Sequence, residues 1–168
     1  MTLIVSPLSQ LDETWRLHQP SHVIGMLAPS TEQPELKGHA ADRRLMLSFH
    51  DINGPMDGYI APDVAMVSSL LEFARGWDGR TPMLVHCWAG ISRSTATAYI
   101  LACERNPGMT ELHIAQRLRA ASPMATPNRL MVQIADDLLG RGGRMVDAID
   151  VIGRGDEAAE GIVFELRL

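Results

Sequence analysis

Cysteine is scarce in this 168-residue sequence, which contains only Cys87 and Cys103. A small secreted domain held together by disulfides would need more than these two. The chain also lacks an apolar run long enough to cross a membrane, and it does not open with a charged segment followed by a secretory apolar stretch. These absences predict a cytoplasmic protein with no membrane contact.

Positive charge is also sparse and is not gathered in runs. Lys37 is the only lysine, and the formal net charge is −5 at pH 7. A nucleic-acid-binding protein would show a basic stripe, and a protein that prefers anionic lipid would show a basic patch. We therefore expect neither nucleic acid nor a lipid surface as a partner. The sequence does not indicate an oligomeric state.

Hydrophobic residues are plentiful at 46%, enough for a sizeable core in one domain. In the first half of the chain, short apolar runs alternate with segments of helical periodicity, and in the second half helical segments follow one another. This order predicts the α/β class, with a mostly parallel central sheet flanked by helices and a helical C-terminal half. We expect a main domain over residues 1–142, with a short helix and a tail, 143–168, packed on it.

Turn-forming residues and apolar periodicity together predict where each element lies. The segment 28–43 should be mostly loop, and 162–168 an extended tail. In the helix that begins near 126, Leu130, Ile134 and Leu138 are expected to form the buried face. Strands are predicted at 3–5, 22–27, 45–49 and 83–85, and helices at 8–19, 62–75, 92–105, 110–121, 126–139 and 145–152.

The stretch Pro82–Ser94 reads as a buried strand, a tight loop and a helix. That geometry directs several backbone N–H groups and the positive end of a helix to one point, which makes an anion site. Its positive field favours the thiolate of Cys87 at the start of the loop. The planar fork of Arg93, at its end, fits two phosphate oxygens. The plainer interpretation is a buried cysteine beside an arginine that caps a neighbouring group.

The loop begins with His86-Cys87, continues with five residues, and ends with Arg93-Ser94. This resembles the signature of the protein tyrosine phosphatase superfamily, and the resemblance covers roughly residues 20–140. The short chain is most similar to the compact, dual-specificity-like branch. The resemblance implies a phosphatase fold and hydrolysis of phosphate monoesters through a cysteinyl-phosphate intermediate. The expected partner is a phosphorylated protein, such as one carrying phosphotyrosine, or a small phosphate ester.

The resemblance also implies roles for individual residues. Cys87 would be the nucleophile, and Ser94 would hydrogen-bond its sulfur and help expel the thiolate. His86 would support the loop rather than move protons. No cofactor or metal is expected, because the loop already supplies positive charge. Gly90 should leave room for the phosphate to approach the backbone. The phosphate would be held by Arg93 and by the loop residues Trp88, Ala89, Gly90, Ile91 and Ser92.

Two aspartates, Asp51 and Asp57, compete for the role of the general acid that protonates the leaving oxygen, and Asp63 is a lesser alternative. Asp51 directly follows a strand and begins the run Asp-Ile-Asn-Gly-Pro, which resembles the acid loop of the same branch. Right-handed crossovers would bring it to the same sheet edge as Cys87. Asp57 lies in an ordinary turn context, and Asp63 in the first turn of a helix. Asp51 is the preferred candidate.

Two further residues have two interpretations each. Asn128, in Thr-Pro-Asn, resembles a family residue near the site, and it would equally serve at the start of a helix. Cys103 is expected to be a small buried hydrophobe rather than a redox partner.

Two other functions are compatible with the loop. A non-catalytic phosphate-binding module could use the same fold, and a rhodanese-like sulfurtransferase also places a cysteine in an anion loop. The intact Cys87 and Arg93 argue against the first, and the Arg-Ser ending argues against the second.

Overall fold

The computed structural model describes residues 1–36 and 38–167; Lys37, in the predicted 28–43 loop, and Leu168, at the end of the predicted tail, lie outside the described residues. Its centre is a five-stranded sheet in the order β3-β2-β4-β1-β5. The first four strands pair in parallel, and β5 pairs with β1 in the antiparallel sense. The strands are β1 (Thr2–Pro7), β2 (His22–Leu27), β3 (Arg44–Ser48), β4 (Met83–Cys87) and β5 (Phe164–Arg167).

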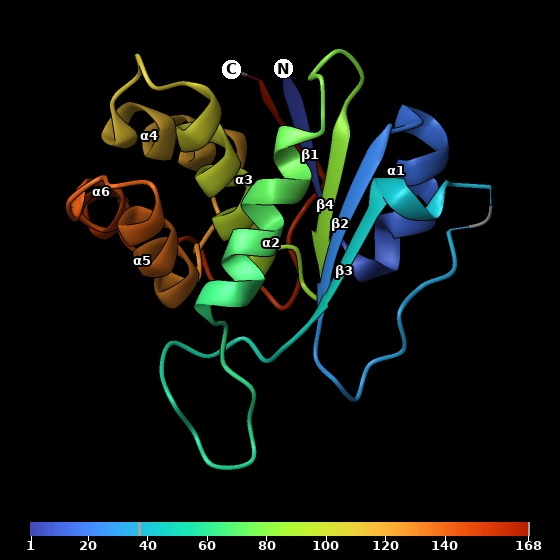
Figure 1. The fold of residues 1–168 in the computed structure, drawn as a ribbon, viewed down its shortest axis with the longest axis horizontal. Helices are drawn as coiled ribbons and strands as arrows, with labels where there is room; N and C mark the ends of the chain where they lie inside the picture. Colours follow the sequence, from blue (N-terminus) through green and yellow to red (C-terminus); the bar gives the residue numbers. More distant parts are fainter. Residues whose placement is uncertain (37, 168) are drawn as a thin grey trace.

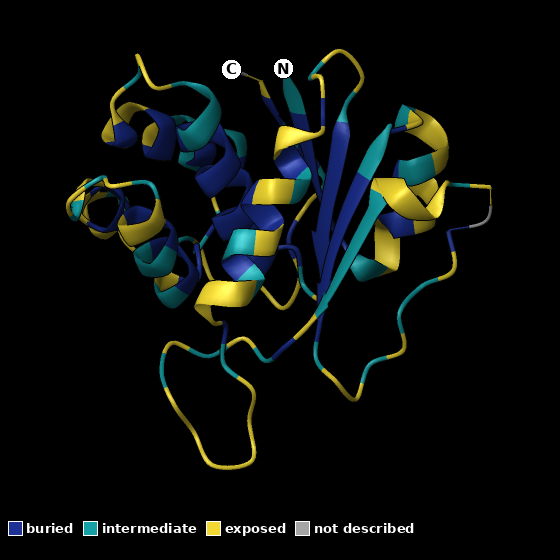
Figure 2. Ribbon diagram, viewed as in Figure 1, coloured by how far each residue is buried: buried dark blue, intermediate teal, exposed yellow. Residues whose placement is uncertain are grey.

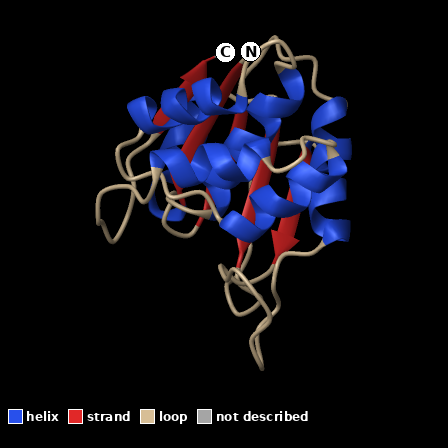
Figure 3. Ribbon diagram, turned by 90° about the vertical axis from the view of Figure 1, so that its left-hand side faces the viewer, coloured by secondary structure: helices blue, strands red, loops and turns tan. Residues whose placement is uncertain are grey.

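Helices cover both faces of this sheet. One face carries α1, and the other carries α2 to α6, as Figure 1 shows. Figure 3 looks onto the larger helical layer, with the strands behind it. This confirms the predicted fold class. The helices are α1 (Leu11–His18), α2 (Val64–Arg75), α3 (Arg93–Arg105), α4 (Glu111–Ala121), α5 (Arg129–Leu138) and α6 (Arg144–Ile152), with short 3-10 turns at Leu8–Gln10 and Ala41–Arg43.

The central strand β4 has all five residues buried, as expected for a strand with both faces covered (Figure 2). Successive side chains of a strand point to opposite faces. Met83, Val85 and Cys87 accordingly join the core under α2 to α6, and Leu84 joins the smaller cluster under α1. This alternation places Cys87 on the side of the sheet where α3 packs.

The predicted buried face of α5 is only partly right, because Ile134 packs against the core and Leu130 is half-buried, but neither is among the residues that are fully inside. The buried residues of this helix are Met131, Val132, Ala135 and Asp136, while Leu138 is exposed. Asp136 is fully buried because its carboxylate accepts hydrogen bonds from the backbone N–H groups of Gly143 (2.6 Å) and Met145 (2.7 Å) at the start of α6. An apolar periodicity could not show that a buried carboxylate would occupy this face.

The C-terminal end of the chain is part of the sheet. β5 forms an edge strand beside β1, and Figure 1 shows the two chain ends side by side. Between α6 and β5 the chain has no helix or strand from residue 153 to 161. We call this segment the C-terminal strap. It returns to the edge of the sheet at which the parallel strands end, where it contacts the loop after β4.

Candidate active site

The loop between β4 and α3, residues 88–92, is the signature loop of the sequence. Gly90 occupies the left-handed region with φ of +70°. A Cβ atom there would lie only 2.8 Å from the backbone nitrogen of Pro7, at the end of β1. Glycine is therefore required by this close approach and by the backbone conformation, whereas the sequence suggested access for phosphate as the reason.

Backbone N–H groups from three distant segments bind the carbonyl groups of this loop. In a trans peptide the carbonyl and the following N–H point in opposite directions. Each external bond therefore turns the next N–H of the loop away from the segment that donates the bond, which is the orientation that an anion-binding nest requires. The bonds run from Leu8 to Trp88 (3.0 Å), Gly161 to Ala89 (2.8 Å), Thr126 to Ile91 (2.9 Å) and Asn128 to Ser92 (3.3 Å).

Cys87 lies at the centre of these groups. Its sulfur accepts a hydrogen bond from the Gly90 N–H at 3.2 Å and lies 3.2 Å from the hydroxyl of Ser94. The residue is 2% exposed and precedes the N-terminus of the 13-residue helix α3. The N-terminus of α3 and the Gly90 N–H therefore both direct partial positive charge toward this sulfur.

Arg93 begins α3, and its side chain is held against the residue that follows β3. Its Nη1 donates to the carbonyl of Phe49 at 2.7 Å, and its guanidinium carbon lies 5.8 Å from the centre of the Phe49 ring. Nε is buried and has no hydrogen-bond partner among the described residues. A buried donor without a partner is costly, and an anion in the loop would satisfy it.

His86 points to the opposite side of the sheet from Cys87. It is fully buried, and burial, together with the nearby charge of Arg93, lowers its pKa from 6.5 to about 4. A Cβ atom at Gly25 would lie 2.5 Å from its Nε2, so the neighbouring strand leaves space for the ring. Neither ring nitrogen has a hydrogen-bond partner among the described residues. His86 is therefore a neutral group packed beneath the loop at pH 7.

Asp51 is fastened to the signature loop and to the start of α5. Its Oδ1 accepts hydrogen bonds from the hydroxyl of Ser92 (2.7 Å) and from Nδ2 of Asn128 (2.8 Å). Its neighbour Asn53 accepts bonds from the backbone N–H groups of Arg129 (2.9 Å) and Leu130 (3.3 Å). Both bonds to the carboxylate use Oδ1.

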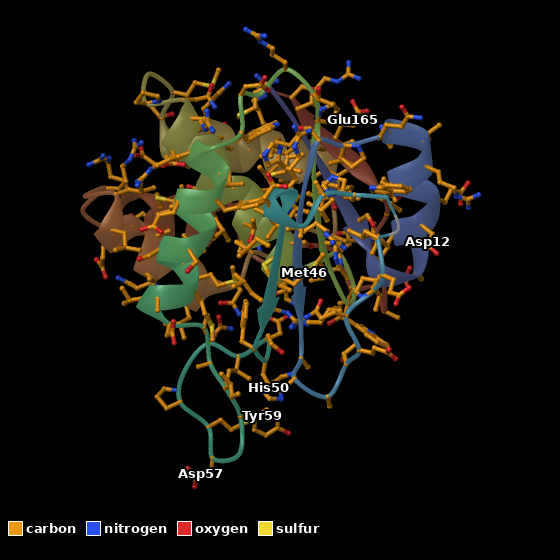
Figure 4. All side chains as sticks on the ribbon, turned by 45° about the vertical axis from the view of Figure 1, so that its right-hand side comes forward. Asp12, Met46, His50, Asp57, Tyr59 and Glu165 are labelled. Carbon is orange, nitrogen blue, oxygen red and sulfur yellow. The ribbon has the colours of Figure 1, made fainter. Side chains whose placement is uncertain are left out.

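The other two aspartates lie elsewhere. The connection between β3 and α2, residues 49–63, forms a long loop whose two sides meet at His50 and Ile60. The His50 N–H donates to the Ile60 carbonyl at 2.8 Å, and the Ile60 N–H donates to Nδ1 of His50 at 2.9 Å. The rings of His50 and Tyr59 meet edge to face. Figure 4 shows Asp57 beyond these residues, at the outer end of the loop. Asp63 is the N-cap of α2, where its Oδ1 accepts the N–H of Met66 at 2.8 Å.

Asn128 fulfils both interpretations of its sequence context. Its Oδ1 accepts the Met131 N–H at 3.0 Å and so caps α5, while its Nδ2 binds Asp51 and the carbonyl of Ile52. Cys103 lies within α3, where burial raises the pKa of its thiol to about 12. It lies outside the pocket described below.

A pocket of about 390 Å³ opens over the signature loop. Cys87, Arg93 and Asp51 all line it, and Trp88, which is 60% exposed, stands at its side. Ala158 and Ala159 of the C-terminal strap form another part of its wall. The sequence did not reveal these two residues; the only signal was the set of glycines at 153, 155 and 161, which permits close backbone approach. The remaining lining residues are Ala28, Thr31, Ala89, Ile91 and Ser92.

Within residues 1–36 and 38–167, no group of three or more His, Cys, Asp or Glu side chains is arranged to hold a metal ion. Over the same residues, every helix is too short or too polar to cross a bilayer.

Comparison with known proteins shows which of them have a similar fold. No protein-family model and no curated protein sequence matches the chain, so the likeness comes from solved structures. Solved structures that share this architecture include proteins named as dual-specificity or tyrosine phosphatases, so the chain has the fold of the protein tyrosine phosphatase superfamily.

Three solved structures illustrate this likeness. DUSP15 is similar over 93% of this chain and 94% of its own, with a TM-score of 0.65 and 19% identity. The human tyrosine phosphatase-like serine/threonine/tyrosine-interacting protein is similar over 83% and 91%, with a TM-score of 0.64 and 20% identity. Human DUSP28 is similar over 80% and 86%, with a TM-score of 0.59 and 17% identity.

Proposed function

We propose that this protein is a phosphatase that hydrolyses phosphate monoesters, such as phosphotyrosine, through a cysteinyl-phosphate intermediate. The observation that carries the proposal is the surroundings of the Cys87 sulfur, which has the Gly90 N–H and the Ser94 hydroxyl within 3.2 Å at the base of a pocket lined by Arg93 and Asp51. An activated nucleophile, positive charge for the phosphoryl oxygens and a proton donor are what this reaction needs.

In the first step the Cys87 thiolate attacks phosphorus, and the bond between phosphorus and the ester oxygen breaks. Asp51 gives its proton to that oxygen, which leaves as the alcohol or phenol. Arg93 and the loop amides hold the three equatorial oxygens, where charge is spread in the transition state. The Nε of Arg93, which has no partner among the described residues, is the donor most directly available to the phosphoryl group.

In the second step water attacks the cysteinyl phosphate. Asp51, now ionised, takes a proton from the water, and the sulfur–phosphorus bond breaks to release inorganic phosphate. The Ser94 hydroxyl, 3.2 Å from the sulfur, donates to the thiolate that departs. A hydrogen bond to a charged sulfur stabilises it more than one to a neutral ester sulfur, so this contact favours bond breaking.

The proposal is tested by turnover of a phosphotyrosine peptide and an aryl phosphate, beside the variant Cys87→Ser. The wild-type protein should release phosphate from both, and the variant should release none while it still binds inorganic phosphate or vanadate. A wild-type protein that binds phosphate without turnover would be a binding module. One that instead transfers sulfur from thiosulfate to cyanide would be a sulfurtransferase.

A further inference from the structure

The C-terminal strap is fastened at both ends to the surroundings of the signature loop. At its start, the Arg119 guanidinium donates to the carbonyls of Gly153 (2.8 Å) and Ala125 (2.8 Å), and the N–H of Gly155 binds the hydroxyl of Thr126 at 3.1 Å. Near its end, the Glu160 carboxylate accepts the hydroxyl of Ser9. The strap is thus held in place independently of any substrate.

Gly161 is the residue at which the strap reaches the loop. Its N–H donates to the Ala89 carbonyl at 2.8 Å. That carbonyl and the Gly90 N–H belong to one trans peptide unit and point in opposite directions. The Gly90 N–H is the group that donates to the Cys87 sulfur at 3.2 Å. The bond from Gly161 therefore sets which end of this peptide faces the sulfur.

The Ala89–Gly90 peptide needs the hydrogen bond from Gly161 to hold its orientation, because it precedes a glycine. Rotation of the Ala89–Gly90 unit would change φ of Gly90, and glycine populates positive and negative φ with similar ease. The rotated peptide would point the carbonyl of Ala89 at the sulfur, where its negative end would oppose a thiolate and a phosphoryl group. The external hydrogen bond disfavours that orientation, because rotation would leave both Gly161 and Ala89 without their partners.

We propose that Gly161 is a positioning residue for catalysis: through its backbone N–H the C-terminal strap holds the Ala89–Gly90 peptide with its donor toward Cys87. The inference rests on the proposed function for the role of the thiolate. The absence of a side chain at Gly161 allows the strap to approach the signature loop closely. Gly161 is buried, and a Cβ atom there would lie 3.1 Å from the Gly90 carbonyl and 3.3 Å from the Ala89 carbonyl.

The test compares Gly161→Pro, which removes the N–H, with Gly161→Ala, which keeps it and adds the same Cβ. The readout is the rate of alkylation by iodoacetate at each cysteine from pH 5 to pH 8, followed by mass spectrometry. It reports ionisation of Cys87 without requiring turnover. Cys103 is an internal control, because it is buried and burial raises the pKa of its thiol, so that it should react slowly for as long as the fold holds.

In the wild-type protein Cys87 should react rapidly at pH 6 and Cys103 slowly. In Gly161→Ala the added Cβ crowds the carbonyls of Ala89 and Gly90, so a small loss of rate at Cys87 is expected although the N–H is kept. In Gly161→Pro the rate at Cys87 should fall about 10- to 100-fold at pH 6, as expected for a lost hydrogen bond to a charged group, and recover at higher pH. Identical profiles for the two variants would overturn the positioning role. A wild-type Cys87 as slow as Cys103 at every pH would instead overturn the proposed function.

If Cys103 also becomes reactive in Gly161→Pro, that variant has unfolded, and Gly155→Ala decides. A Cβ atom at Gly155 would lie 2.5 Å from backbone atoms of Pro123 and Met124, so this change pushes the strap outward without removing a donor. Its matched control is Gly108→Ala, where a Cβ meets nothing within 4 Å. Slower alkylation of Cys87 at pH 6 in Gly155→Ala alone supports the inference, and equal profiles contradict it.

Discussion

Single residues in this site serve packing and chemistry at once. Gly90 permits the close approach of the loop to Pro7 and also supplies the N–H that reaches the sulfur of Cys87. Asn128 caps a helix with one atom of its amide and holds Asp51 with the other. Substitutions at such positions need controls that separate the two contributions.

Asp51→Asn should show that Asp51 is the general acid. A nitrophenolate leaves readily without a proton, whereas a tyrosine phenolate or an alkoxide needs one. We expect a small loss of rate on nitrophenyl phosphate and a loss of about 10²–10⁴-fold on phosphotyrosine peptides. The fall in rate at high pH should also flatten, because that limb reports loss of the proton from the acid.

Asp57→Asn is the matched control, because Asp57 lies at the exposed outer end of the same loop. It should leave the ratio of the two substrates unchanged. Leaving-group dependence in Asp57→Asn, with none in Asp51→Asn, would move the assignment to Asp57.

His86 should make the stability of the protein depend on pH. Burial, with a smaller contribution from Arg93, lowers its pKa from 6.5 to about 4. Between these values the unfolded chain binds a proton that the folded protein does not, so the free energy of unfolding rises with pH across this window. We expect His86 to account for a loss of about 2 kcal/mol between pH 7 and pH 5.

Denaturant unfolding of the wild type and of His86→Gln at pH 7, 6 and 5 measures this contribution. The variant should lose less stability on acidification, since all other titrating groups are shared by the two proteins. Parallel pH dependences would show that the pKa of His86 is the same in the folded and the unfolded state.

At the scale of elements, the site is a junction of chain connections. The loop after β3 supplies Asp51, the end of β4 supplies Cys87, and the start of α5 supplies Asn128. The C-terminal strap adds part of the pocket wall. Each connection follows or precedes a rigid element, and hydrogen bonds between the connections fix their relative positions.

The start of α5 offers a way to separate capping from positioning. Asn128→Ala should lose the cap of the helix, about 1 kcal/mol of stability, together with the contact to Asp51. Asn128→Ser should retain the cap, because serine is an equally good N-cap, but its shorter side chain should not reach Asp51. We expect both variants to lose about tenfold in turnover of phosphotyrosine.

Only the alanine variant should be markedly less stable in thermal unfolding. Full activity in the serine variant would show that the contact between Asn128 and Asp51 does not contribute to turnover.

Much of the element pattern could be predicted, because each element carries its own signal. The apolar run His22–Leu27 predicted both ends of β2, and Gly76 predicted that α2 ends at Arg75. The face of α5 could not be predicted, because a buried Asp136 interrupts its apolar pattern in order to cap α6. The pairing of the tail with β1 depends on contacts between opposite ends of the chain, which periodicity does not report.

The same limit applies to the site. The residues of the signature loop were evident because their order in the sequence is distinctive. Asp51 was placed beside Cys87 from topology alone, since parallel strands end at one edge of a sheet. The positions of Ala158, Ala159 and Gly161 beside the loop arise from backbone approach rather than from side-chain chemistry, and only the glycines of the strap hinted at it in the sequence.

At the scale of the whole molecule, the sheet order sets β1 between β4 and β5, so that the end of β1 lies beside the signature loop. β1 contributes Pro7 against Gly90, and the residue after it, Leu8, binds the Trp88 carbonyl. β5 pairs along β1, so the strap that precedes it must pass the loop. The antiparallel edge strand is thus the element that delivers Gly161 to the site.

The most direct test of the central claim is detection of the intermediate. The wild-type protein would be mixed with a phosphotyrosine peptide, quenched within milliseconds and analysed by mass spectrometry of its peptides. The account predicts one phosphoryl group on the peptide that contains Cys87, formed and lost at the rate of turnover, and none on that peptide in Cys87→Ser. Turnover with no phosphorylated Cys87 at any quench time, or turnover retained in Cys87→Ser, would contradict it.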